Sequence, residues 1–356
     1  MYIRVVRDRP TSNPTSRFAR VEVDYEPGEG PPPSSVTLLE DASRSILSQN
    51  DSPDLGFRWS VNPYRGCVHA CAYCYARPTH EYLDLGAGTD FDTKIVVKRR
   101  APAMLRAAFD APSWNGELVV FSGVTDCYQP VESKLALTRG CLEVCLEYRN
   151  PVSVVTKSAL VERDVDLLAE LARVASAHVS VSLAFSDPEL QRAIEPWAPA
   201  PARRLKVIET LARAGVPVGV LVAPVIPGLS DRELPAVLAR ARDAGATSAS
   251  WVLLRLPGAV ASVFEERVRA ALPLRAERIL ARIRETRGGE RLYDPRFHAR
   301  QRGQGGYADA IGALFGATAS RLGLRERPRE EPPVRTTFRR PPRPGDQLDL
   351  FGSSGD

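Results

Sequence analysis

Three cysteines crowd into eight residues of this sequence, at the spacing Cys67-x3-Cys71-x2-Cys74. Thiolates so close together in one loop suit a metal centre, because deprotonated sulfur is a strong ligand for iron and zinc. Three thiolates can bind three irons of a cubane iron–sulfur cluster and leave the fourth iron open to another ligand. The spacing therefore predicts an iron–sulfur site.

Two other interpretations fit the same loop. Zinc takes four ligands, and His69 or His80 would supply the fourth beside the three cysteines. Alternatively, the thiols are inert and cluster by chance. Haem attachment is excluded, because Tyr75 rather than a histidine follows Cys74.

The elements that must position this loop follow an alternating βα pattern. Apolar runs predict strands at 59–62, 118–122, 152–156, 179–184, 216–224 and 249–256. Helical periodicity predicts helices at 134–148, 164–175, 202–214, 231–244 and 259–272. Alternation of this kind implies a parallel sheet, and six units are too few for a closed eight-fold barrel. We therefore expect an α/β fold, an open and partial (β/α)6 barrel.

Polar residues fall at the carboxyl ends of these predicted strands, where such folds place their sites. The cysteine loop follows the first strand, and residues 122–126 follow the second. The later strands contribute Lys157, Ser180, Ser182 and Arg255. The pattern thus predicts one site built from several strand ends.

With Tyr73 just before the last cysteine, the loop resembles the C-x3-C-x-aromatic-C signature of the radical S-adenosylmethionine (SAM) superfamily. The wider pattern resembles the subgroup related to spore photoproduct lyase, often called DNA repair photolyases. That pattern comprises residues 62–67, Thr125-Asp126, Thr156-Lys157, Glu195-Pro196 and Ala223-Pro224. The resemblance covers residues 55–320.

The resemblance implies a 4Fe-4S cluster held by Cys67, Cys71 and Cys74, whose open iron chelates the amino and carboxylate groups of SAM. An electron from the cluster would cleave the sulfonium bond, and the resulting 5′-deoxyadenosyl radical would abstract hydrogen from the substrate. A flavodoxin or ferredoxin would be a suitable electron donor.

Five residues would bind SAM by the same resemblance. Thr125 and Asp126 would receive the methionine amino group, and Lys157 would lie near the carboxylate. Ser182 would hydrogen-bond the ribose, and Tyr73 would lie beside the adenine. The alternatives are a core aromatic for Tyr73 and a simple turn for residues 122–126.

The resemblance departs from the lyase at the hydrogen-donating cysteine, where this chain has Gly123. Cys127, just after Asp126, is the candidate catalytic thiol from a shifted position. The mismatch argues against thymine-dimer reversal. Cys141 and Cys145 would face one side of a helix, either as buried small hydrophobes or, with Cys127, as an auxiliary cluster site.

The composition indicates a cytoplasmic globular protein with no membrane partner. Of its 356 residues 44% are hydrophobic, no apolar run is long enough to span a membrane, and the N-terminus carries no apolar signal segment. We expect an irregular N-terminal extension (1–57, with a strand at 19–25), a core with a helical cover (58–325) and a disordered Pro/Arg-rich tail (326–356).

Two segments suggest partners. Residues 291–306 interleave arginines with Tyr293, Phe297 and His298, which suits contact with a nucleic-acid backbone and its bases, or else marks a solvated loop. The tail ends in Gln347-Leu348-Asp349-Leu350-Phe351, which resembles the short peptide that binds the replication sliding clamp. We therefore expect a radical SAM enzyme that acts on DNA or another nucleic acid. The rivals are a radical SAM enzyme for a small molecule or peptide, and a zinc-stabilised nucleic-acid-binding protein without catalysis.

Overall fold

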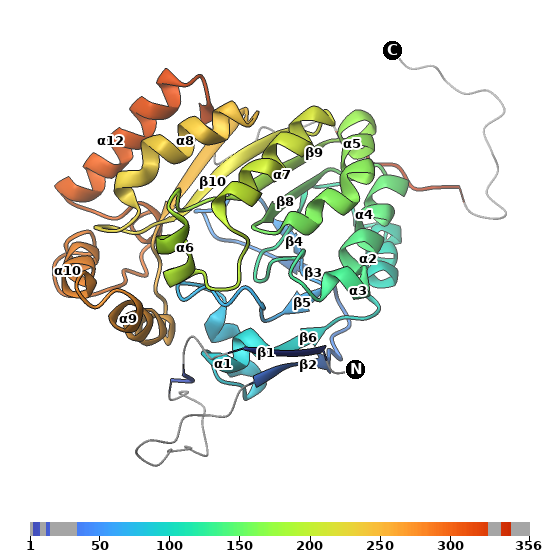
Figure 1. Cartoon of the computed structure of the whole chain (residues 1–356). Helices are drawn as coiled ribbons and strands as arrows, with labels where there is room; N and C mark the ends of the chain where they lie inside the picture. The colour runs from blue at the N-terminus through green and yellow to red at the C-terminus, as the bar shows by residue number, and fades with distance from the viewer. Residues whose placement is uncertain (1–2, 8–11, 15–33, 327–335, 343–356) are drawn as a thin grey trace.

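The computed structural model describes residues 3–7, 12–14, 34–326 and 336–342 (Figure 1). The strand predicted at 19–25 and the terminal motif at 347–351 lie outside these residues. Within the part of the chain that the structure describes, no helix is long and apolar enough to cross a membrane.

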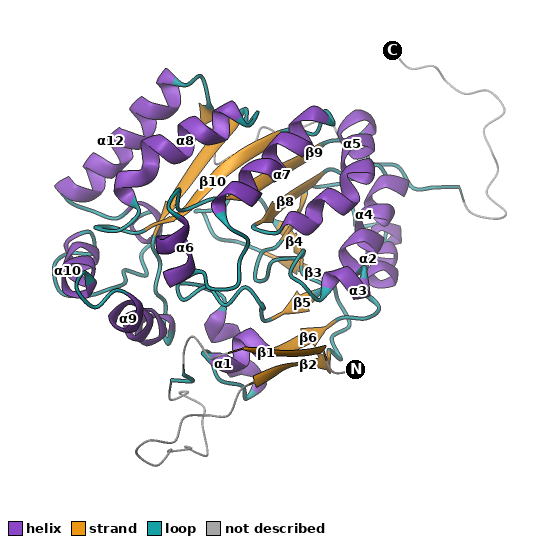
Figure 2. Ribbon diagram, viewed as in Figure 1, coloured by secondary structure: helices purple, strands orange, loops and turns teal. Residues whose placement is uncertain are grey.

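An eight-stranded sheet runs through the centre of the molecule (Figure 2). Its central strands match the six predicted ones and are all parallel: β4 (Trp59–Val61), β7 (Val119–Phe121), β8 (Val152–Thr156), β9 (Ala177–Ser182), β10 (Val218–Val225) and β11 (Ser248–Leu253). The edges are the parallel β12 (Arg325–Glu326) and the antiparallel β3 (Leu47–Gln49). The order β12-β11-β10-β9-β8-β7-β4-β3 leaves the described sheet open, as expected for a partial barrel.

These strands form where the sequence is dense in β-branched residues. Strand β8 reads Val-Ser-Val-Val-Thr and is buried along almost its whole length. Strands buried on both faces are typical of parallel sheets that helices cover. Here the helices lie along the outer side of the sheet, and the carboxyl ends of the strands stay free to carry loops (Figure 2).

The predicted helices are present, with one break. In place of a single helix over 134–148 there are two, because Ala136 takes a left-handed conformation with φ 51°. These helices are α3 (Glu132–Leu135), α4 (Leu137–Glu147), α5 (Val165–Val174), α7 (Pro201–Arg213), α8 (Leu234–Asp243), α9 (Val260–Ala271) and the covering α12 (Gly306–Arg321). The sequence did not predict α1 (Thr89–Thr93), α2 (Ala101–Asp110), α6 (Pro188–Ile194), α10 (Ala276–Glu285) or α11 (Ala299–Arg302).

The N-terminal extension contains more regular structure than its prolines indicate. Besides β3 it supplies β1 (Ile3–Arg7) and β2 (Ser34–Glu40) to a second, four-stranded sheet. There β2 pairs in parallel with β6 (Lys94–Val97), and β6 pairs with β5 (Tyr64–Arg65). Local composition misses this sheet because the paired strands are far apart in the chain. The sheet matters for the site, since β5 leads directly into the cysteine loop.

Residues 336–342, within the tail expected to be disordered, pack against the core. The ring of Phe338 lies 6.0 Å from the rings of Phe109 and Tyr148. The guanidinium of Arg340 donates to the carbonyls of Phe109, Ala111 and Trp114 at 2.7–3.1 Å. The packed ring of Phe338 and the hydrogen bonds from Arg340 therefore hold this segment on the core, although its composition predicts disorder.

Candidate functional site

The three cysteines lie in the loop that leaves β5. Cys67 and Cys71 are buried, Cys74 is partly exposed, and none forms a disulfide. Two tight turns fold the loop, with the amide of Ala70 donating to the carbonyl of Cys67 and that of Cys74 donating to Cys71. These turns bring three side chains that are close in sequence toward one region.

A buried arginine fixes the middle of this loop. The Arg77 guanidinium, which has no exposed surface, donates from Nε and Nη2 to the carbonyl of Cys71 at 3.1 and 2.9 Å. Its remaining donors bind the carbonyls of Ala87 and Gly88 and the carboxylate of Asp92, each at 2.9 Å. Five hydrogen bonds from one rigid, planar group hold the loop backbone in a defined place.

The start of the loop is tied to the segment that follows β7. The carbonyl of Gly66 accepts hydrogen bonds from Thr125 Oγ1 at 2.7 Å and from Gln129 Nε2 at 2.9 Å. Gly66 has φ +79°, and a Cβ there would come within 2.9 Å of the His80 ring, so only glycine fits. Two predicted parts of the site, the cysteine loop and residues 122–126, are thus joined directly.

The donor set fits an iron–sulfur cluster better than zinc. A zinc ion needs four ligands around one point, and the described residues contain no group of three or more His, Cys, Asp or Glu arranged to hold one ion. Each candidate fourth ligand has one ring nitrogen engaged within the chain: His69 Nδ1 lies 3.4 Å from Asp126, and His80 Nε2 lies 2.9 Å from the carbonyl of Lys94. A cubane cluster needs only one thiolate per iron, which three cysteines can supply.

Burial keeps the cysteine thiols protonated until a metal binds. It raises the pKa of Cys71 to about 12, although the Lys157 ammonium acts in the opposite direction. Burial also raises the pKa of Cys67 well above its usual range, and the Asp126 carboxylate adds to the shift. Iron binding would supply the positive charge that makes thiolates stable in such an apolar place.

The Asp126 carboxylate organises the strand ends. It accepts hydrogen bonds from Thr156 Oγ1 at 2.7 Å, from the Lys157 amide at 2.8 Å and from the Tyr128 amide at 3.0 Å. Burial alone would raise the pKa of Asp126, but His69 and these donors outweigh burial and lower it to about 2. Because its oxygens are occupied within the chain, Asp126 is held as a permanent anion, and its contact with a SAM amino group stays a prediction.

A buried polar chain links Tyr73 to Ser182. The Tyr73 hydroxyl donates to Glu195, and Arg204 pairs with the same carboxylate. Arg204 also donates to the carbonyl of Ser182 at 3.1 Å, and Ser182 Oγ donates to Ala223 O at 3.2 Å. The buried ion pair between Glu195 and Arg204 therefore connects Tyr73 of the cysteine loop with Ser182 of β9. Both Tyr73 and Ser182 are predicted site residues.

Lys157 lies against this chain. Its Nζ is 5.7 Å from the centre of the Tyr73 ring. Burial alone would lower the pKa of Lys157, but Cys71 and the Glu195 carboxylate outweigh it and raise the pKa. The side chain is thus a cation next to the cysteine loop, and its contact with a SAM carboxylate stays a prediction.

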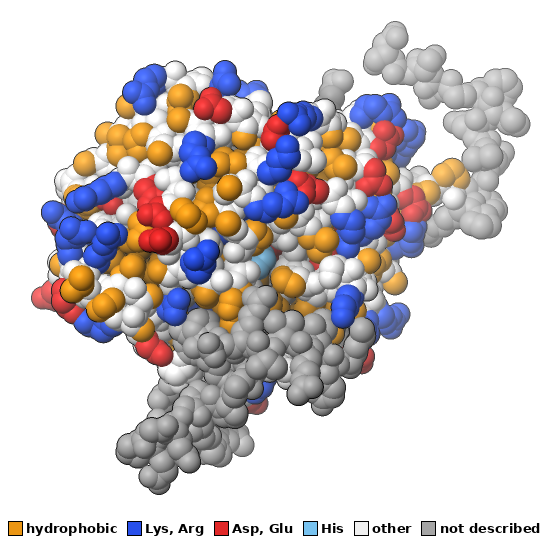
Figure 3. All heavy atoms as spheres, in the orientation of Figure 1, with side chains coloured by type: hydrophobic (Ala, Val, Ile, Leu, Met, Phe, Trp, Pro, Cys, Tyr) orange, Lys and Arg blue, Asp and Glu red, His pale blue; other side chains and the backbone are white. Residues whose placement is uncertain are grey.

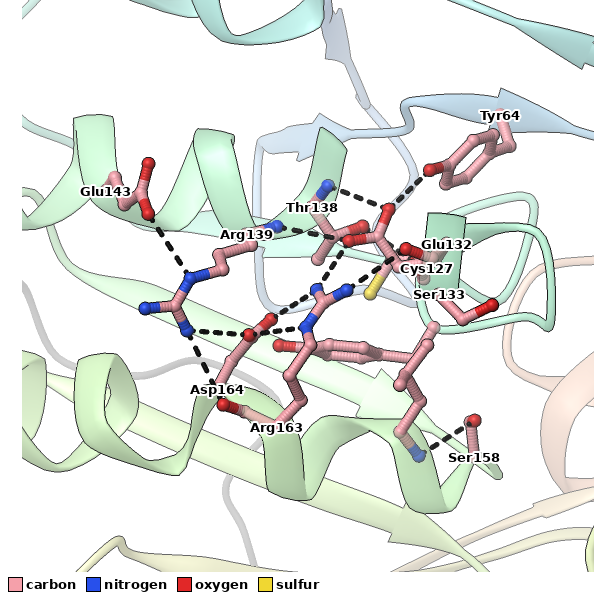
Figure 4. A network of polar contacts seen from close by, with 12 residues as sticks. Tyr64, Cys127, Glu132, Ser133, Thr138, Arg139, Glu143, Ser158, Arg163 and Asp164 are labelled. Atoms are coloured by element: carbon pink, nitrogen blue, oxygen red, sulfur yellow. Dashed lines mark hydrogen bonds and ion pairs between the residues drawn. The ribbon is translucent and has the colours of Figure 1, made fainter. Parts of the chain in front are cut away.

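Cys127 is placed differently from the other predicted residues. Its side chain is 1% exposed and packs in the main apolar core, and burial raises its pKa well above the usual range. It lies beside a buried polar network in which Glu132 accepts hydrogen bonds from Tyr64, from the Thr138 amide and from Arg163 (Figure 4). This placement favours a packing role, and hydrogen donation by Cys127 stays a prediction. Cys141 and Cys145 also pack in the main core.

Two residues at the site were not singled out from the sequence as a pair. The Tyr75 ring, next to Cys74, is 46% exposed, and its hydroxyl donates to the carbonyl of Gly123. The Arg255 guanidinium lies over this ring, 5.3 Å from its centre. The available signal in the sequence for this pair was the tyrosine directly after the last cysteine. Its partner, Arg255, follows β11 and could not be found from that signal.

The basic loop at 291–306 is largely engaged within the chain. Arg296 pairs with Asp294 at 2.6 Å, and Arg300 pairs with Asp54. Arg302 lies over the Trp251 ring at 4.4 Å. Since these guanidinium groups already have partners, the loop is mainly a structural connection, in line with the alternative to a nucleic-acid surface.

The chain is similar to known proteins in sequence and in fold. The sequence profile of the radical SAM superfamily matches residues 61–241. The uncharacterized protein Rv2578c of Mycobacterium tuberculosis H37Rv is 43% identical over 232 residues, which cover 64% of this chain and 68% of that protein. The uncharacterized protein MJ0683 of Methanocaldococcus jannaschii is 31% identical over 200 residues, 56% of this chain and 72% of that one.

The fold is also that of a solved enzyme. Spore photoproduct lyase complexed with dinucleoside spore photoproduct superposes with a TM-score of 0.59 at 15% identity, over 81% of each chain. A variant of the same lyase with bound AdoMet gives a TM-score of 0.55 over the same share of both chains. At this identity the likeness concerns the fold alone.

Proposed function

Because the chain belongs to the radical SAM superfamily, whose members use a 4Fe-4S cluster and SAM, we propose that this enzyme starts radical chemistry on a nucleic acid. When bound, the cluster supplies the electron that cleaves SAM and so provides a radical that removes hydrogen from the substrate. Cys67, Cys71 and Cys74 would hold the cluster. The electron would come from a small redox protein such as a flavodoxin or ferredoxin.

The surrounding residues would bind and orient SAM. Lys157 is half-buried and offers an ammonium group to a carboxylate, and Thr125 Oγ1 keeps lone pairs that can accept from an amino group. Tyr73 and Ser182, held by Glu195 and Arg204, offer an apolar ring and a hydroxyl to the nucleoside. Their burial would keep water from the reacting groups.

The observation that carries the nucleic-acid proposal is the pair Tyr75 and Arg255. An aromatic ring that is 46% exposed, directly after a cluster cysteine and covered by a guanidinium, is a suitable surface on which to stack a base. The lyase with the same fold was solved with a dinucleoside, which supports the proposal by analogy.

The test is SAM cleavage by the reconstituted, reduced enzyme with and without oligonucleotides, including damaged and modified ones. We expect an oligonucleotide to raise the cleavage rate, and Tyr75→Leu to abolish the increase while cleavage without substrate persists. The matched control is Tyr82→Leu, which removes an exposed tyrosine outside the cluster of strand ends. Cleavage that no nucleic acid changes, but that a small molecule or peptide stimulates, would refute the proposed substrate class.

We also propose that residues 347–351 bind the replication sliding clamp. Their sequence, Gln-Leu-Asp-Leu-Phe, supplies apolar anchors in an otherwise polar tail. Support comes from the packed segment 336–342, which contacts Gly116 and Arg149, just before β7 and β8 begin. This segment is thus held at the amino ends of these strands, whereas the cysteine loop contacts residues that follow the carboxyl end of β7. Deletion of residues 345–356 should abolish binding to purified clamp, and unchanged binding would refute the proposal.

A further inference from the structure

A pocket of about 540 Å³ lies between α6, the turn after β10 and the start of α10. This volume is within the range of small-ligand sites. Its lining comprises Leu190, Gly228, Leu229, Arg232, Glu233, Leu274, Arg275 and Arg278. None of these residues belongs to the site described above, and we call this place the arginine pocket.

Positive charge dominates the arginine pocket. Arg232, Arg275 and Arg278 are exposed, and none of them pairs with a carboxylate among the described residues. The carboxylate in the lining, Glu233, is already engaged, since one of its oxygens accepts from Ser186 Oγ at 2.8 Å and from the Asp187 amide at 3.0 Å. Basic side chains gather on the α10 side of this face of the molecule (Figure 3). Three unpaired guanidinium groups around one hollow would bind an anion.

The rest of the lining is apolar. Leu190 and Leu229 pack against the core beneath the pocket, whereas Leu274 is 100% exposed. Leu274, beside three cations, therefore packs against no other side chain in the part of the molecule that the structure describes. A ligand with a phosphate and an apolar, planar part, such as a nucleotide unit, would satisfy both kinds of surface.

The arginine pocket lies at the same end of the sheet as the cysteine loop. Gly228 follows the carboxyl end of β10, and α6 follows the carboxyl end of β9. Leu229 and Ile279 of α10 belong to the same apolar cluster as Cys71 and Tyr73. A strand that enters the site could therefore continue over this pocket without leaving that face.

We propose that the arginine pocket binds phosphate groups of a nucleic-acid strand and holds the polymer beside the reaction site. This inference rests on the proposed function, because it names the surface that grips the same substrate. It favours the pocket over the loop at 291–306 as the basic contact surface, because Arg296 and Arg300 of the loop already pair with carboxylates, whereas the three pocket arginines pair with no carboxylate of the described residues.

The experiment compares two triple variants of the full, reconstituted chain. One carries Arg232→Gln, Arg275→Gln and Arg278→Gln. The control carries Arg100→Gln, Arg242→Gln and Arg321→Gln, exposed arginines on other elements, so that both lose the same net charge. Binding of a labelled single-stranded oligonucleotide is measured by fluorescence anisotropy over a range of salt concentrations, with a nucleoside monophosphate as competitor.

Loss of three phosphate contacts should lower the affinity about 50-fold at 0.15 M salt and flatten the slope of log K against log salt by about 2. The control triple variant should change the affinity and the salt slope far less. Equal losses in the two variants would overturn the arginine pocket while the proposed function stands. An unmodified chain that binds no oligonucleotide would overturn both. If the nucleoside monophosphate competes as effectively as unlabelled oligonucleotide, the pocket binds free nucleotides. That result would overturn the assignment to a polymer.

Discussion

Replacing Arg77 with lysine tests how the cysteine loop is held in place. The guanidinium makes five hydrogen bonds to four groups, and none of its surface is exposed. Lysine keeps the charge but has one nitrogen with three donors, so at least two of the five bonds are lost. Three donors leave at least one of the four acceptor groups unpaired, and a buried acceptor without a donor costs about 1–3 kcal/mol, so we expect Arg77→Lys to lower the free energy of unfolding by about 1–3 kcal/mol.

The loss should also reach the cluster. The Cys71 carbonyl accepts two of the five hydrogen bonds. Without them the loop backbone would no longer hold the Cys71 sulfur in a fixed position. Urea unfolding followed by circular dichroism measures the stability, and iron and sulfide content after anaerobic reconstitution measures the site. The control is Arg99→Lys, at an exposed pair with Glu40, which should cost under about 0.5 kcal/mol. An Arg77→Lys chain within about 1 kcal/mol of the unmodified one, with full iron content, would refute this account of the loop.

Three further predictions concern the core, the cover and the tail. Cys127→Ala should lower the free energy of unfolding by about 1–2 kcal/mol, as expected of a packed thiol. The rates of SAM cleavage and product formation should stay within two-fold of those of the unmodified chain. Loss of product with intact SAM cleavage would make Cys127 the hydrogen donor. Burial and a hydrogen bond to Asp231 raise the pKa of Tyr307 to about 12, whereas an unfolded tyrosine ionises near 10.0, so its stabilisation is full below pH 10 and is lost as the pH rises toward 12. The free energy of unfolding measured in urea should therefore be about 1 kcal/mol higher for the unmodified chain than for Tyr307→Phe at pH 8, with a smaller difference at pH 11, and a constant difference would contradict the assignment. Phe338→Ala should release residues 336–342 to limited proteolysis faster than Thr337→Ala does, and equal rates would show that the ring does not hold the segment.

The parts of the site that the sequence predicted are those that local pattern determines. The cysteine spacing gave the metal chemistry, and the βα alternation placed Lys157 and Ser182 at strand ends, where the structure has them. The partner of the Glu195 carboxylate, in contrast, is apparent only from the fold. Arg204 turns inward to Glu195, whereas Arg203 pairs with Glu162 on the surface.

The parts that were missed depend on contacts between distant segments. Strand β2 is a strand because β6 lies beside it, and residues 336–342 are fixed because Phe109 and Tyr148 leave a place for Phe338. The sequence of the loop at 291–306 is rich in arginine, but Asp54 of the N-terminal extension pairs with Arg300 of this loop. Charge in a sequence does not reveal which arginines have partners, and the arginine pocket became apparent only when those partners were known.

The central claim is that this chain uses three cysteines and SAM for radical chemistry. The most direct measurement is the formation of 5′-deoxyadenosine from SAM by the anaerobically reconstituted and chemically reduced protein. We expect product together with a 4Fe-4S signal in the electron paramagnetic resonance spectrum, and neither when Cys67, Cys71 and Cys74 are replaced by serine. A purified chain that holds zinc and forms no 5′-deoxyadenosine would contradict the account.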